Sequence, residues 1–266
     1  MRAAAIKNAI VATIILSVGM AASTTLADES PDLSQAPGEH STLSTSDGKI
    51  RDDELVDYIV EQIILNGGKV KDVKIIVNCC FGGGLLDEFQ RAFGPGGPLE
   101  GTPWVAGAAS EADQRAWGWS DAKVSEFPTG GSTFTDAVVG PATSPSDPLS
   151  GTARDRTTDN VKEDLEAAAI FDATGSYGQG KEDAVIASGN GGENITWNGA
   201  GGGHQAVVFG GKQNRQRHHN NIKNVKEALE ELWSGDPHTI RDIDGGTTQD
   251  LKNAIAAACQ NLDENT

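Results

Sequence analysis

The stretch VKIIVNCCFGGGLLDEF, residues 73–89, predicts the fold of this chain. Residues 74–77 are short, mostly apolar and β-branched, which is typical of a strand buried in a parallel sheet. Cys79 and Cys80 follow where that strand ends, a glycine turn comes next, and residues 85–93 have the pattern of a helix. A strand, a turn and a helix in this order place the two cysteines at the carboxyl edge of an open α/β sheet, where such folds bind ligands.

The two adjacent cysteines allow two interpretations. A thiol near a helix N-terminus has a lowered pKa and can act as a nucleophile. A pair of buried structural cysteines on the strand is the alternative. A disulfide between neighbours such as Cys79 and Cys80 would be badly strained. Because the chain has only three cysteines, with Cys259 in a helical pattern, at least one thiol stays unpaired within it.

The first 27 residues have the features of a secretory signal peptide. Arg2 and Lys7 form a basic start, residues 9–22 an apolar run and residues 25–27 a small-residue cleavage site. We therefore expect a secreted or periplasmic protein, with no membrane contact after the signal is cleaved. An uncleaved anchor is the alternative, although the apolar run is short for a membrane span.

The charge of the chain restricts its partners. The 266 residues include 21 basic and 38 acidic ones, a net charge of −17. Without Arg2 and Lys7, 19 basic residues stand against the 38 acidic ones, and the net charge is near −19. This much negative charge argues against nucleic acid or an anionic membrane surface as a partner.

The rest of the chain predicts one domain. Residues 28–50 are rich in Ser, Thr and Pro and are expected to be a polar flexible segment. Residues 51–266 are expected to form a single domain, beginning with a helix from Arg51 that stops at Asn66. Further strands are predicted over 102–109, 205–209 and 238–243, helices over 134–139, 161–171, 220–233 and 248–261, and irregular segments over 110–119, 142–160 and 189–203. Strands that alternate with helices predict an α/β fold with a mostly parallel sheet flanked by helices.

Three segments resemble the caspase-fold cysteine peptidases, in particular their legumain-like branch. IIVNCCFGGGLLDEF and WVAGAASEADQRAWGW are similar to the nucleophile strand of the family and the strand after it. VVFGGKQNRQRHHNNIKNVKEALEEL is similar to the family's first strand and helix, although it comes later in this chain. The resemblance therefore implies a circularly permuted caspase-like domain, which a fold with neighbouring termini tolerates.

The resemblance also implies roles for single residues. Cys80 matches the catalytic nucleophile, with Cys79 in a small-residue place and Asn78 where the family has Gln or Glu. Arg217 and His218 match the Arg-His pair that follows the first strand, so Arg217 would bind an acidic or amide side chain of the substrate. A surface arginine in a basic run is the alternative for Arg217.

The family's catalytic His follows an apolar strand and precedes a Gly. Glu39-His40-Ser41 resembles this turn, which implies His40 as the acid that protonates the leaving amine. The N–H groups of Cys80 and Ser41 would then bind the oxyanion. An exposed loop histidine is the alternative for His40, because neither residues 261–266 nor residues 28–39 supply the apolar strand.

Other histidines and motifs of the chain are further candidates for the same site. The substitutes for His40 are His204, His218, His219 and His238, and Ser188-Gly189-Asn190-Gly191 resembles the catalytic turn with Asn in place of His. Residues 242–245 match part of a calcium loop without its remaining ligands, and no zinc, phosphate or nucleotide motif is present, so no cofactor is expected. The sequence predicts a secreted cysteine-type endopeptidase acting on a peptide or protein substrate. The alternative is a catalytically inactive relative that serves as a secreted binding or scaffold protein.

Overall fold

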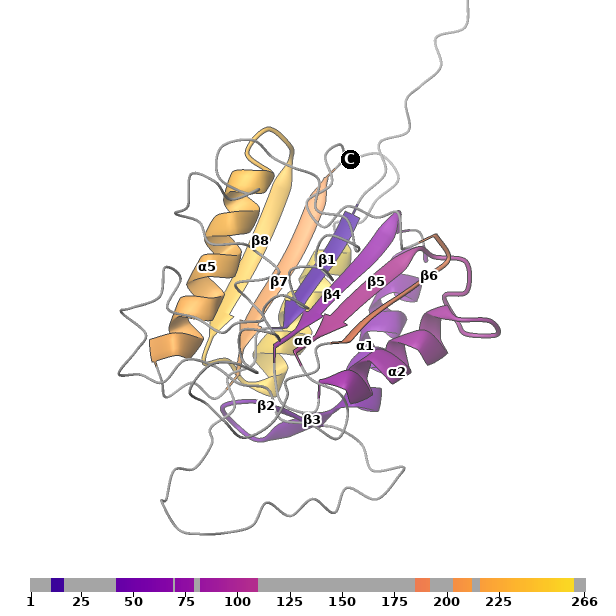
Figure 1. Ribbon diagram of the computed structural model, residues 1–266, viewed down its shortest axis with the longest axis horizontal. Helices are drawn as coiled ribbons and strands as arrows, with labels where there is room; N and C mark the ends of the chain where they lie inside the picture. Colours follow the sequence, from indigo (N-terminus) through magenta and orange to yellow (C-terminus); the bar gives the residue numbers. More distant parts are fainter. Residues whose placement is uncertain are drawn as a thin grey trace, which may run out of the picture.

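The computed structural model describes residues 11–16, 42–68, 70–78, 82–109, 185–191, 203–211 and 216–260. Helices and strands alternate along these residues, as the sequence predicts for an α/β fold (Figure 1). In chain order they are β1 (Val11–Leu16), β2 (Thr42–Ser44), β3 (Lys49–Arg51), α1 (Asp52–Leu65), β4 (Asp72–Val77), α2 (Gly83–Phe93), β5 (Trp104–Ala108), β6 (Val185–Gly189), β7 (His204–Gly210), α5 (Gln216–Leu232), β8 (His238–Asp244) and α6 (Thr248–Gln260).

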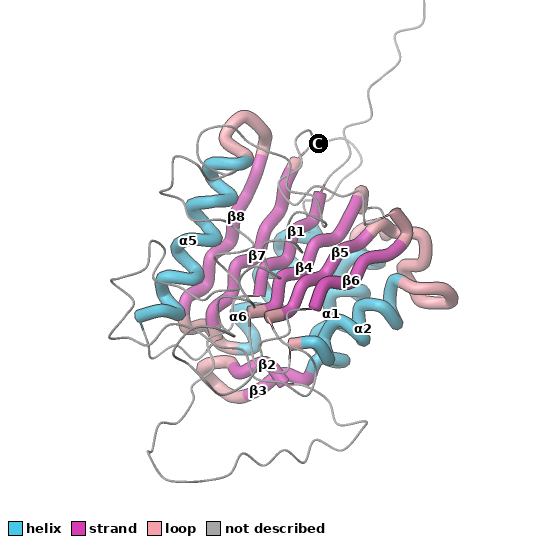
Figure 2. The backbone as a smooth tube through the Cα atoms, in the orientation of Figure 1, coloured by secondary structure: helices cyan, strands magenta, loops and turns pink. Residues whose placement is uncertain are grey.

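A mixed six-stranded sheet forms the centre of the fold, in the order β6-β5-β4-β1-β7-β8. The pairings β5 with β4, β4 with β1, β1 with β7 and β7 with β8 are parallel, and β6 runs antiparallel to β5. Helix α1 packs against α2 on one side and α6 on the other (Figure 2). Helix α2 packs against β5 and β6, α6 packs against β7, β8 and β1, and α5 packs against β7 and β8.

The central strand β1 comes from the segment that the sequence assigns to a signal peptide. Residues 11–16 pair in register with β4 on one side and with β7 on the other. Removal of residues 1–27 would therefore take out the strand that joins the two halves of the sheet. Within the part of the chain that the structure describes, no helix is long and apolar enough to cross a membrane.

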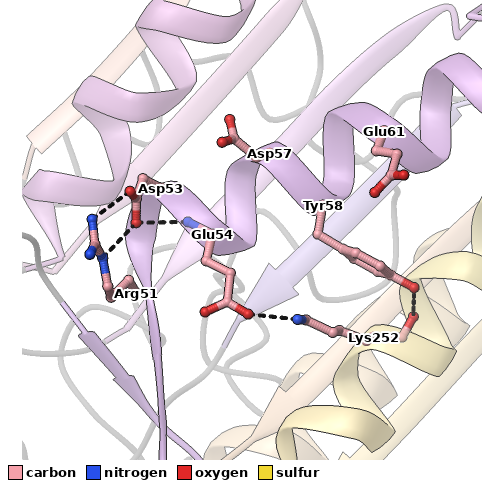
Figure 3. Close-up of a pocket in the computed structure, with 7 residues that line it drawn as sticks. All are labelled: Arg51, Asp53, Glu54, Asp57, Tyr58, Glu61 and Lys252. Atoms are coloured by element: carbon pink, nitrogen blue, oxygen red, sulfur yellow. Dashed lines mark hydrogen bonds and ion pairs between the residues drawn. The ribbon is translucent and has the colours of Figure 1, made fainter.

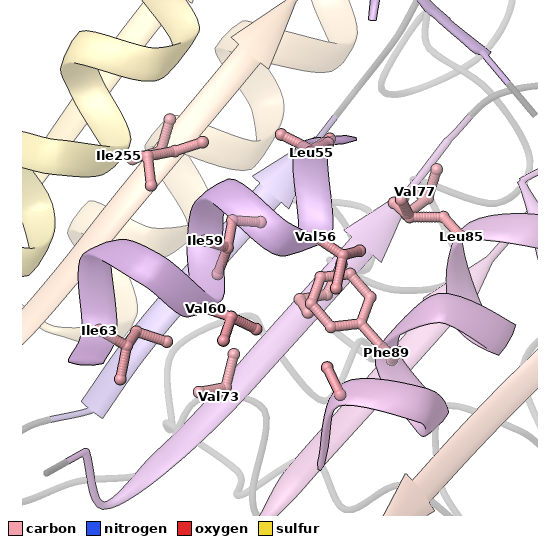
Figure 4. Close-up of a cluster of buried hydrophobic side chains, with 14 of the residues drawn as sticks. Leu55, Val56, Ile59, Val60, Ile63, Val73, Val77, Leu85, Phe89 and Ile255 are labelled. Carbon is pink, nitrogen blue, oxygen red and sulfur yellow. The ribbon is translucent and has the colours of Figure 1, made fainter. Parts of the chain in front are cut away.

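The main core lies between the sheet and the layer of α1, α2 and α6 (Figure 4). The apolar residues of α1 recur at helical spacing, so they form one face that turns toward the sheet. Each such side chain contributes about 1.5–3 kcal/mol when it is fully buried. The buried residues labelled in Figure 4 are Leu55, Val56, Ile59, Val60, Ile63, Val73, Val77, Leu85, Phe89 and Ile255.

A small hairpin, β2 with β3, lies in the last part of the segment over residues 28–50 that the sequence predicts to be flexible, whereas residues 28–41 lie outside the described residues. Leu43 and Ile50 of the hairpin are buried and belong to the core cluster. The Asp47 carboxylate in its turn accepts hydrogen bonds from the Thr45 hydroxyl at 2.8 Å and from the N–H of Thr248, the first residue of α6, at 2.9 Å. The hairpin is thus an ordered part of the domain.

The other boundaries agree with the sequence to within a few residues, with two differences. Helix α5 begins at Gln216, four residues before the predicted start, and β6 was not predicted. The predictions for residues 110–119, 134–139, 142–160 and 161–171 lie outside the described residues.

Candidate functional site

The carboxyl ends of the five parallel strands, β5, β4, β1, β7 and β8, meet at one edge of the sheet. Val77 of β4 is the register partner of Leu16 in β1, which in turn pairs with Phe209 of β7. Asp244, the last residue of β8, pairs with Gly210. Adjacent strands lie about 4.8 Å apart, so the end of β4 is about 5 Å from the end of β1 and about 10 Å from the end of β7.

The predicted site residues belong to segments that adjoin this edge. Cys79 and Cys80 lie outside the described residues, between Asn78 at the end of β4 and Gly82 before α2. His40 and Ser41 also lie outside them and directly precede β2. The backbone positions of Arg217 and His218 are in the first turn of α5, but their side chains are not described.

Contacts among described residues place both β2 and α5 at the carboxyl edge. The Ser46 N–H donates to the Gly246 carbonyl at 2.9 Å, just after β8. Gly211, just after β7, lies so close to the Ser44 carbonyl that an added Cβ would be 1.8 Å from its oxygen. At the start of α5, Nδ1 of His219 is 2.6 Å from Oδ2 of Asp244. The structure therefore gathers the elements that flank every predicted site position.

The start of α2 is suited to a negatively charged group. The N-cap position is Gly82, and the first turn contains no acidic residue. No carboxylate of that turn therefore compensates the partial positive charge of the helix dipole at this end. Such an end stabilises a thiolate placed near it.

The described histidine side chains do not lie near the end of β4. His204 and His238 begin β7 and β8, so they lie at the amino edge of the sheet, opposite the cysteine segment. Burial, reinforced by the charge of Lys74, lowers the pKa of His204 to about 4. His219 is at the carboxyl edge, but its partner strand β8 is three strand spacings, or about 14 Å, from β4.

The turn at residues 188–191 has a structural role at the opposite edge. Because β6 is antiparallel, it ends beside Trp104, the first residue of β5. Asn190 has a positive φ of 54°, and its side-chain amide donates to the carbonyls of Phe93 at 2.8 Å and Thr102 at 3.0 Å. This turn resembles a catalytic turn in sequence, but it lies at the edge of the sheet opposite the end of β4.

The incomplete calcium motif is explained by ion pairs. The carboxylate of Asp242 is 3.0 Å from Nζ of Lys226, and that of Asp244 binds His219. No group of three or more metal-ligating side chains occurs among the residues that the structure describes.

A pocket of about 500 Å³ lies on the outer surface of α1 (Figure 3). Two ion pairs lie within it: Lys252 of α6 binds the Glu54 carboxylate at 2.6 Å, and Arg51 binds Asp53 through two nitrogens. The Tyr58 hydroxyl donates to the Lys252 carbonyl at 3.2 Å. The pocket contains none of the predicted site residues.

The third cysteine is structural, as its position in a helix suggests. Cys259 is a free thiol buried between α6 and the sheet, and burial raises its pKa to about 12. A thiol with such a pKa is almost entirely protonated at neutral pH and is a poor nucleophile. Any thiol reactivity of the folded protein near pH 7 would therefore come from Cys79 or Cys80.

Two features of this edge were missed from the sequence. Strand β1 was hidden because an apolar run after basic residues has the same composition as a signal peptide. The hairpin could have been found from Ser46-Asp47-Gly48, a turn sequence between the alternating residues of β2 and β3.

No protein-family model matches the chain, and comparisons with curated proteins and with solved structures gave no match. Its function is therefore inferred from its own residues and geometry.

Proposed function

We propose that the chain is a cysteine-type endopeptidase with a permuted caspase-like domain, in which Cys80 is the nucleophile. The observation that carries the proposal is the place of β4 in the sheet. Its last residue, Val77, is three residues before Cys80 and lies beside the end of β1, and α2 begins three residues after Cys80. A nucleophile in this short connection is restricted to the carboxyl edge and to the neighbourhood of the α2 N-terminus.

Strand β1 supports the permutation. The resemblance requires an apolar strand at the junction between the chain's two ends, next to the nucleophile strand. Val11–Leu16 is apolar, stands near the start of the chain and pairs directly with β4. Residues 28–39 and 261–266 do not provide an apolar strand, so β1 is the candidate for the strand that the resemblance requires.

The place of α5 supports Arg217 as the substrate-binding residue. Lys226 and His219 pair with Asp242 and Asp244, so α5 lies along β8. Arg217 belongs to the first turn of this helix, two residues before His219, and this turn lies at the carboxyl edge of the sheet.

In the proposed reaction, the Cys80 thiolate attacks the scissile carbonyl and the N–H groups of Cys80 and Ser41 stabilise the oxyanion. His40 protonates the leaving amine, since it directly precedes the hairpin that is anchored at this edge. Arg217, with His218 beside it, would select a peptide with an acidic or amide side chain. The enzyme would act outside the cell or in the periplasm, with β1 retained in the folded protein.

A second candidate function is favoured by the residues that follow β1. These are Ser17-Val18-Gly19, so valine stands where the resemblance expects the catalytic histidine before its glycine. Valine cannot transfer a proton. If His40 does not substitute for it, the chain is an inactive relative that binds a peptide or protein at the same edge.

Alkylation and peptide hydrolysis together test the two candidates. For the peptidase we expect iodoacetamide to label wild type and Cys79→Ala at pH 7, but not Cys80→Ala, and a library of Asp, Asn and Glu peptides to be cleaved with the same pattern. His40→Ala should abolish cleavage and leave labelling. Absence of both labelling and cleavage contradicts the peptidase. A gain of cleavage in Val18→His alone would establish the inactive relative.

A further inference from the structure

A buried histidine and a tryptophan are stacked at the amino edge of the sheet, away from the candidate site. His204, the first residue of β7, is 1% exposed, and its ring lies flat on the Trp233 ring with centroids 4.6 Å apart and planes 5° apart. Trp233 directly follows α5 and is equally buried. Neither ring nitrogen of His204 has a hydrogen-bond partner among the described residues, and Nε2 is 3.8 Å from the Asp236 carboxylate.

Trp233 and Asp236 belong to the turn over residues 233–237, and backbone hydrogen bonds hold this turn in place. The N–H of His204 donates to the Pro237 carbonyl at 2.8 Å, and the N–H of Asp236 donates to the Trp233 carbonyl at 2.9 Å. Residues 233–237 therefore attach the end of α5 to the first residue of β7. The stack is the side-chain part of this attachment.

Charged groups from three elements surround the His204 ring. From β4 come Lys74, which is buried and binds Asp72 at 2.7 Å, and Asp72 itself. The turn contributes Asp236, and β8 contributes His238, whose ring is 6.1 Å from that of Trp233. Burial and then Lys74 oppose a charged imidazole, whereas Asp236 and Asp72 favour it, and the net effect is the lowered pKa of about 4.

We propose that the His204–Trp233 stack is an acid-sensitive latch that holds the C-terminal end of α5 and residues 233–237 on the sheet. A neutral ring packs on the indole and leaves two unpaired nitrogens but no charge out of water. A protonated ring gains a cation–π contact with Trp233, but it must stay out of water and near the Lys74 ammonium. Release of the turn returns the charged ring to water.

The direction of the pH dependence follows from linkage. In the released turn, His204 titrates near its ordinary pKa of 6.5, whereas in the closed latch its pKa is about 4. The closed form is therefore fully favoured above pH 6.5 and is progressively lost as the pH falls from 6.5 to 4. Below pH 4 the opening equilibrium has risen about 300-fold, since each pKa unit is a factor of ten.

Hydrogen exchange of the full chain tests the latch. At pH 4.5, after correction for intrinsic rates, we expect amides of residues 229–238 to exchange about 70-fold faster than at pH 7.5, and residues 55–63 of α1 to stay unchanged. His204→Phe keeps an aromatic stack without a titrating group and should remove this acceleration. His219→Gln and His238→Gln, which change the other histidines whose side chains the structure describes, should retain it.

A second measurement does not depend on the folding of a variant. NMR titration of the wild-type His204 ring should follow the loss of protection and give an apparent pKa well below 6.5. Acceleration that persists in His204→Phe, or a His204 ring that titrates near 6.5 while residues 229–238 stay protected, would overturn the latch.

Discussion

Leu16 of β1 lies opposite Val77 of β4, and each is the last residue of its strand. This register makes the N-terminal strand the immediate neighbour of the strand that leads to the cysteines. It also places β1 between β4 and β7, where it is hydrogen-bonded on both sides.

The first prediction concerns β1 itself. Proline at Ile14, whose register partners are Ile75 and Val207, removes an N–H from the middle of a central strand. We expect Ile14→Pro to lower the free energy of unfolding by about 2–4 kcal/mol or to prevent folding. The matched control Ile14→Val keeps the backbone N–H and should cost at most about 1 kcal/mol. Urea unfolding measures both changes.

The same strand gives a mass-spectrometric test of signal cleavage. Because the sheet needs residues 11–16, we expect the folded protein to retain them. A stable, folded protein whose first residue is Asp28 would show that β1 is dispensable and that the first 27 residues act as a removable signal.

The third prediction uses two isoleucines of α1. Ile59 is fully buried against the sheet, whereas Ile64 is 48% exposed on the same helix. Ile59→Ala should lower the free energy of unfolding by about 2–5 kcal/mol, because it removes buried surface and leaves a cavity. Ile64→Ala should stay within about 0.5 kcal/mol of wild type. Equal effects in urea unfolding would contradict the position of the core.

The fourth prediction concerns Cys259. Its buried thiol, with a pKa near 12, should not be alkylated in the folded protein at pH 7, but should react once the protein is unfolded in denaturant. Mass spectrometry of peptides from native and denatured samples measures this difference. Rapid labelling of Cys259 in the native protein would contradict its burial. Labelling of the whole protein could then no longer be assigned to Cys80.

The fifth prediction concerns the anchor of the hairpin. The hydrogen bonds from the Thr248 N–H and the Thr45 hydroxyl lower the pKa of the Asp47 carboxyl group below its ordinary value of 3.8. The ionised carboxylate therefore stabilises the hairpin fully at pH values above 3.8, and this stabilisation is lost as the pH falls below that value. At neutral pH, Asp47→Ala should reduce exchange protection of residues 42–51, and Asp47→Asn should reduce it less because an acceptor oxygen remains.

The control for Asp47 is an exposed residue of the same hairpin. Lys49→Ala should leave the exchange of residues 42–51 unchanged. If Asp47→Ala also leaves it unchanged, the buried Leu43 and Ile50 hold the hairpin without the anchor.

The sequence by itself determined the α/β class and most of its elements. The strands β4, β7 and β8 and the helices α1, α2 and α6 were predictable because their apolar periodicity and their glycine turns are local features of the chain. It also marked residues 79–80 as the end of a strand, because a strand, a glycine turn and a helix succeed one another there.

Only the tertiary structure decided which of these elements lie next to one another. The apolar run at residues 11–16 is compatible with a signal peptide or a strand, and its pairing with β4 and β7 is a long-range relationship that composition does not contain. For the same reason the sequence could not show which histidines lie at the same edge of the sheet as the candidate site. His204 and His238 were assigned to the far edge, and His219 to the outer strand, by strand direction and strand order. These two properties arise from hydrogen bonds between segments that are distant along the chain.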